Sequence, residues 1–113
     1  MILRFHLDPG VYLFIYLDLG IVGPDSTPTR LYQHLLRRIA SRVEDPGPKE
    51  EITGIAQQDT IDSYHLTDAF EAITGKGLYI MLLMDDFENI WGNTNFGPEF
   101  YHSLRSLAIH YRR

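Results

Sequence analysis

Cysteine is absent from the 113 residues of this sequence. A disulfide framework, a thiol nucleophile and a zinc site built on thiolates are therefore excluded, and we expect a cytoplasmic protein. Basic residues are also scarce: 10 Lys and Arg stand against 15 Asp and Glu, which gives a formal charge of -5. Neutralising nucleic-acid phosphates requires the opposite balance, so the composition disfavours a nucleic-acid partner.

Long apolar runs are missing as well. The longest ones, near residues 11–17 and 78–84, are far shorter than the roughly 20 residues that a membrane-spanning helix needs. Asp8, Pro9 and Asp18 interrupt the apolar N-terminal stretch, which argues against a secretory signal. We therefore expect no membrane partner and a single domain over residues 1–113.

Two segments read as fully buried strands. Val11 to Leu17 (VYLFIYL) and Leu78 to Met84 (LYIMLLM) are apolar throughout and show no alternation of polar and apolar residues. Such runs are typical of parallel strands that are covered by helices on both faces. Only two strands of this kind occur, which indicates part of a larger sheet.

Apolar residues at helical spacing predict helices between and after these two strands. Ser26-Thr27-Pro28 supplies a capping hydroxyl and a proline for a helix of about four turns. A second helix is expected before Gly75 and Gly77, and a third enters at Gly97-Pro98. The apolar positions of the three helices are Leu31, Leu35, Leu36, Ile39 and Val43; Leu66, Ala69, Phe70 and Ile73; and Phe100, Leu104, Leu107, Ala108 and Tyr111.

The remaining segments read as connections. Residues 44–59 carry two prolines, two glycines and clustered charge, so we predict a mobile connection with at most one short turn, and residues 91–95 (WGNTN) a loop. The order strand, helix, helix, strand, helix predicts an α/β fold with a parallel sheet.

An acidic tip ends the second strand, where Leu82-Leu83-Met84 is followed by Asp85 and Asp86. Ligands of parallel α/β sheets bind at the carboxyl ends of the strands. An apolar strand followed by an aspartate and a second carboxylate is the pattern of a Walker B element, which holds Mg²⁺ through water and orients an attacking water. A purely structural role, in which Asp85 caps a turn and Asp86 faces solvent, fits the same residues.

Three stretches in order resemble the central part of P-loop ATPases of the AAA+/STAND type. They are LDPGVYLFIYLDL with TPTRLYQHLLRRIA, the Walker B-like LYIMLLMDDFENI, and NTNFGPEFYHSLRSLAIHY. The resemblance implies a partial P-loop NTPase-like sheet and a nucleotide-dependent switch with ATP and Mg²⁺ as cofactors. Asp85 would be the cofactor-binding residue and metal ligand, and Asp86 the catalytic, water-positioning residue.

Two departures from the family pattern limit this activity. The sequence contains no G-x-x-x-x-G-K-[ST] phosphate loop, and Gly75-Lys76-Gly77 leads from a helix into a strand, the reverse of the required order. Asp86 stands where the family usually has the longer glutamate. The resemblance also places the sensor strand and arginine finger beyond Arg113, so we expect no ATP hydrolysis by this chain alone.

Other functions remain open. A non-catalytic interaction module or a degenerate remnant would use open sheet edges to bind a protein partner or to self-associate. A truncated receiver-like phosphotransfer domain also begins with a strand and an acid pair, but only 27 residues follow Asp86. The i, i+3 pairs Glu99/His102 and Asp62/His65 lack the four-helix setting of a di-iron centre, so we assign no metal to them.

Overall fold

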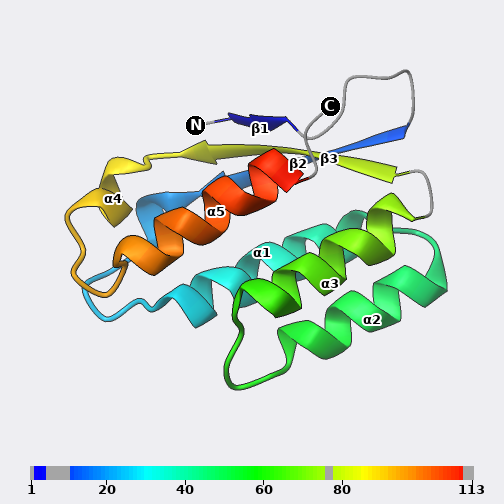
Figure 1. The fold of residues 1–113 in the computed structure, drawn as a ribbon, viewed down its shortest axis with the longest axis horizontal. Helices are drawn as coiled ribbons and strands as arrows, with labels where there is room; N and C mark the ends of the chain where they lie inside the picture. The colour runs from blue at the N-terminus through cyan, green and yellow to red at the C-terminus, as the bar shows by residue number, and fades with distance from the viewer. Residues whose placement is uncertain (1, 5–10, 76–77, 111–113) are drawn as a thin grey trace.

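The structure is a computed structural model that describes residues 2–4, 11–75 and 78–110. Figure 1 shows its ribbon. The elements run in the order β1 (Ile2–Arg4), β2 (Val11–Asp18), the short 3-10 helix η1 (Leu19–Ile21), α1 (Pro28–Arg42), α2 (Pro46–Ala56), α3 (Ser63–Thr74), β3 (Leu78–Asp85), α4 (Glu88–Trp91) and α5 (Pro98–His110).

The sheet has the strand order β1-β3-β2. β2 and β3 are parallel over their full length, from Val11 opposite Leu78 to Asp18 opposite Asp85. This confirms the predicted parallel pair and the α/β class. β1 pairs antiparallel with the other side of β3 and was not predicted, because three residues give too short a pattern to recognise.

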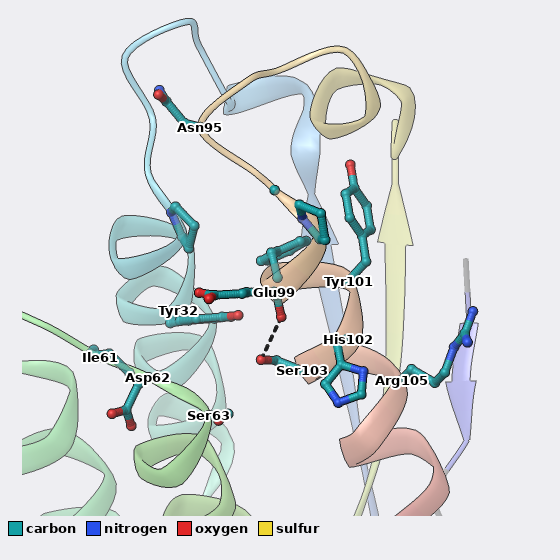
Figure 2. A pocket seen from close by; sticks show the side chains of 14 residues that line it. Tyr32, Ile61, Asp62, Ser63, Asn95, Glu99, Tyr101, His102, Ser103 and Arg105 are labelled. Carbon is teal, nitrogen blue, oxygen red and sulfur yellow. Dashed lines mark hydrogen bonds between the residues drawn. The ribbon is translucent and has the colours of Figure 1, made fainter.

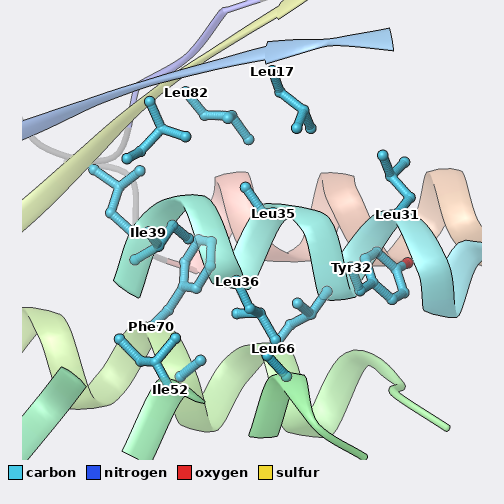
Figure 3. Packing of buried hydrophobic residues seen from close by; sticks show 14 of the residues in the cluster. Leu17, Leu31, Tyr32, Leu35, Leu36, Ile39, Ile52, Leu66, Phe70 and Leu82 are labelled. Atoms are coloured by element: carbon cyan, nitrogen blue, oxygen red, sulfur yellow. The ribbon is translucent and has the colours of Figure 1, made fainter. Parts of the chain in front are cut away.

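The helices that the structure describes cover one face of this sheet. α1, α2, α3 and α5 all lie on the same side of the strands (Figures 1 and 3). Leu13, Ile15 and Leu17 of β2 are buried, whereas the alternate residues Phe14 and Tyr16 are exposed by 58% and 44%. The prediction that both faces are covered is therefore wrong for the described part of the chain. Apolar side chains on both faces concealed the alternation.

The core forms between the sheet and two helical layers (Figure 3). Leu17 and Leu82 point from the strands toward α1, whose Leu35 points back at them. Leu36, on the opposite side of α1, faces α2 and α3 and is completely buried. The middle position of α1 explains why its apolar stripe is wide enough to serve two layers.

The predicted start of α1 is confirmed. The Thr27 hydroxyl accepts a hydrogen bond from the Arg30 backbone N–H at 3.3 Å, and Pro28 occupies the first helical position. The prediction for residues 44–59 is wrong, because α2 fills most of that segment. Asp45 caps this helix, and its prolines lie in the first turn, where a missing N–H costs nothing.

The other helices agree with the sequence pattern in position. α3 ends at Gly75 as expected, while Gly77 lies outside the described residues. α5 begins at Pro98, and the expected helical position Tyr111 also lies outside. Trp91 is the last residue of α4 rather than the start of a loop. Within the described ranges, no helix combines the length and apolarity needed to cross a membrane.

Candidate functional site

The carboxyl ends of β2 and β3 bring aspartates from two distant parts of the chain together. Asp18 and Asp85 are in register as the last residues of the two parallel strands. Both belong to the set of alternate positions that the helices leave exposed. This edge is where open α/β sheets bind their ligands. We call Asp18, Asp85 and Asp86 the carboxylate cluster.

Asp85 is held in place by two hydrogen bonds. Its Oδ2 accepts from the Tyr16 hydroxyl at 2.7 Å, and its Oδ1 accepts from the Asp86 backbone N–H at 2.9 Å. The hydrogen bond to Asp85 raises the pKa of Tyr16 to about 12, because ionisation would destroy it and place two negative charges side by side. Tyr16 is therefore a neutral donor that orients the Asp85 carboxylate.

Asp18 and Asp86 converge on Gly20. The Gly20 backbone N–H donates to Asp18 Oδ1 at 2.8 Å, so Asp18 caps η1. A Cβ atom built on Gly20 would lie 2.9 Å from Asp18 Oδ1 and 3.1 Å from Asp86 Oδ2. A side chain here would push the two carboxylates away from the point where they meet, so glycine allows their close approach.

Asp86 is the most perturbed member of the cluster. Its φ of 58° is the only positive value at a non-glycine residue among those described. The Asp85 carboxylate is the main cause of its raised pKa; partial desolvation, Glu88 and Asp18 raise it further. Asp18 also accepts a hydrogen bond from the protonated form. Clustered carboxylates that raise one another's pKa in this way are a common feature of cation sites and acid–base sites.

Two asparagines join the loops that follow β2 and β3. The Asn93 side-chain amide donates to the Gly23 carbonyl at 2.9 Å. The Asn95 amide donates to the carbonyls of Pro24 and Ser26, both at 2.9 Å. A hollow of about 380 Å³ lies between these loops, and Asn89 on its wall donates to the Asp86 carbonyl at 3.2 Å. The loop predicted at 91–95 therefore fixes the surroundings of the carboxylate cluster.

A cavity larger than this hollow lies between α1, α5 and the start of α3 (Figure 2). Its volume is about 1180 Å³, and Tyr32, Ile61 and Phe100 form its apolar part. Burial raises the pKa of Tyr32 to about 12, and the nearby Ser103 hydroxyl partly opposes this rise. Ser103 itself donates to the Glu99 carbonyl on its own helix at 2.9 Å. Neither Tyr32 nor Ser103 is therefore an activated nucleophile, and size alone does not make this cavity the best candidate.

The histidine pairs have local explanations. Asp62 caps α3 by accepting from the His65 backbone N–H at 3.1 Å, while His65 Nδ1 accepts from the Asp62 backbone N–H at 3.1 Å. This reciprocal arrangement is a capping box. Glu99 and His102 lie on the rim of the large cavity (Figure 2).

The structure places both predicted site residues, Asp85 and Asp86, in the carboxylate cluster and adds residues that sequence reasoning missed. Asp18 could have been found, since it also follows an apolar strand and parallel strands end at the same edge. Tyr16 and Gly20 gave no such signal, because their roles depend on the register of β2 against β3. In the described ranges, no group of three or more His, Asp or Glu side chains has the geometry of a complete metal site.

Comparison with known proteins found no matching family model, no similar curated protein and no similar solved structure.

Proposed function

We propose that this chain forms part of an ATP-binding domain of the AAA+/STAND type and acts as a nucleotide-dependent switch. The observation that supports this most is the position of Asp85, at the carboxyl end of β3 and in register with Asp18 on a parallel neighbour. Mg²⁺–nucleotide complexes bind at such an edge, and the Walker B-like segment ends at this residue.

The donor set fits a magnesium ion that is shared with a ligand. Mg²⁺ prefers carboxylate oxygens and keeps several waters, so it commonly takes one or two protein carboxylates together with phosphate oxygens. Asp85 would be the protein ligand, directly or through water, and Tyr16 would hold its carboxylate in position. Bound Mg²⁺ would supply charge neutralisation for the phosphates. The mutual repulsion that raises the Asp86 pKa would then be offset.

Asp86 is the candidate water-positioning residue. Its carboxylate lies beside Asp85 and Asp18, at the edge where a phosphate would sit. An aspartate reaches less far than the family's glutamate, so we propose slow hydrolysis and a switch that remains bound to ATP for long periods. The proposal requires a phosphate loop, which these 113 residues do not contain.

The coding DNA upstream of Met1 provides the first test. A glycine-rich Gly-Lys-Ser/Thr loop in frame within about 60 residues, the reach of one strand, loop and helix, supports the proposal. The extended chain should then bind ATP in a Mg²⁺-dependent manner, and Asp85→Asn should abolish that dependence while Asp45→Asn, a helix cap far along the chain, should not. An upstream stop codon without such a loop would overturn the ATPase proposal.

The uncovered sheet face favours a second function, that of a protein-interaction module. Parallel strands occur almost only in sheets that are covered on both faces. Here Phe14, Tyr16 and Leu83 are exposed by 58%, 44% and 41% on the side without helices. Exposed apolar clusters of this kind commonly mark binding surfaces. This function does not require ATP, so it survives a negative result in the nucleotide test.

A further inference from the structure

We draw no further inference here: the strongest candidate, the cavity between α1, α5 and the start of α3, is lined by the carboxylates of Asp62 and Glu99 as well as by the imidazole of His102 and the guanidinium of Arg105, and nothing in the structure shows which class of ligand occupies it.

Discussion

Leu82 and Leu83 are neighbours on β3 with opposite surroundings, and replacing each by alanine tests whether the sheet is covered on one face. Leu82 is exposed by 1% and points to the helices, whereas Leu83 is exposed by 41% on the uncovered face. The two substitutions remove the same atoms from adjacent positions of the same strand. Differences in strand propensity therefore largely cancel.

The expected magnitudes follow from burial. Leu→Ala removes three carbon atoms, worth about 2.4 kcal/mol when fully buried at about 0.8 kcal/mol each. For Leu82 the cavity that remains adds to this loss, so we expect about 3 kcal/mol. Leu83 is about three fifths buried, so its substitution loses about three fifths of the 2.4 kcal/mol. Because the site is open to solvent, no closed cavity adds to this loss, and we expect about 1 kcal/mol.

Urea unfolding followed by circular dichroism measures both values. The expected difference of about 2 kcal/mol corresponds to a roughly 30-fold difference in the unfolding equilibrium constant, well above the error of the method. Equal losses of about 3 kcal/mol for the two variants would refute the reasoning, because they would mean that Leu83 is packed as tightly as Leu82.

Further predictions concern α2 and the carboxylate cluster. Ile52→Ala should cost about 2–5 kcal/mol in urea unfolding, since this α2 side chain is completely buried. Gly20→Ala should lower the thermal midpoint because its Cβ collides with the cluster, whereas Gly23→Ala, with nothing within 4 Å, should have no such effect. Asn95→Ala should cost about 1–3 kcal/mol through its two lost hydrogen bonds between the loops. Asp86→Asn should be more stable than the parent near neutral pH and lose that advantage in acid.

The sign of the last prediction follows from proton linkage. The folded protein binds a proton at Asp86 more readily than the unfolded chain does, because Asp85 raises its pKa. Between the ordinary carboxyl pKa and this raised value, parental stability therefore falls as the pH rises. Asparagine removes this dependence and also tolerates the positive φ better. A parental stability that rises through this window relative to the variant would contradict the prediction.

The sequence predicted those strands and helices that short stretches of neighbouring residues identify clearly. β2, β3 and α1 were predictable because apolar runs and a Thr-Pro start depend on nearby residues alone. α2 was missed because Pro46, Gly47 and Pro48 normally interrupt structure. Their position in the first turn, after the Asp45 cap, determines their effect, and composition alone does not reveal that position.

Face coverage could not be predicted for a different reason. Phe14, Tyr16 and Leu83 are as apolar as their buried neighbours, so the sequence contains no contrast between the two faces. Partners outside the 113 residues would explain apolar side chains on an uncovered face. The apolar residues on both faces of β2 and β3 thus indicate that both faces are suited to burial. They do not reveal which face the helices of these 113 residues cover.

The sequence predicted two residues of the candidate site and missed the residues that surround them. Asp85 and Asp86 follow a recognisable strand, and the structure places them at the expected edge of the sheet. The contributions of Asp18 and Tyr16 depend on the register between strands whose paired residues, such as Asp18 and Asp85, are 67 positions apart in the sequence, and only the fold defines this register.

The most direct test of the proposed site is paramagnetic broadening by Mn²⁺, which prefers the same oxygen ligands as Mg²⁺. The amide signals of Asp18, Asp85 and Asp86 are followed together with those of Asp45 and Asp62, which cap helices elsewhere. The account predicts selective broadening of the first three signals that excess Mg²⁺ reverses and that Asp85→Asn abolishes. Broadening of equal strength at all five aspartates, or broadening that persists in Asp85→Asn, would contradict a cation site at the end of β3.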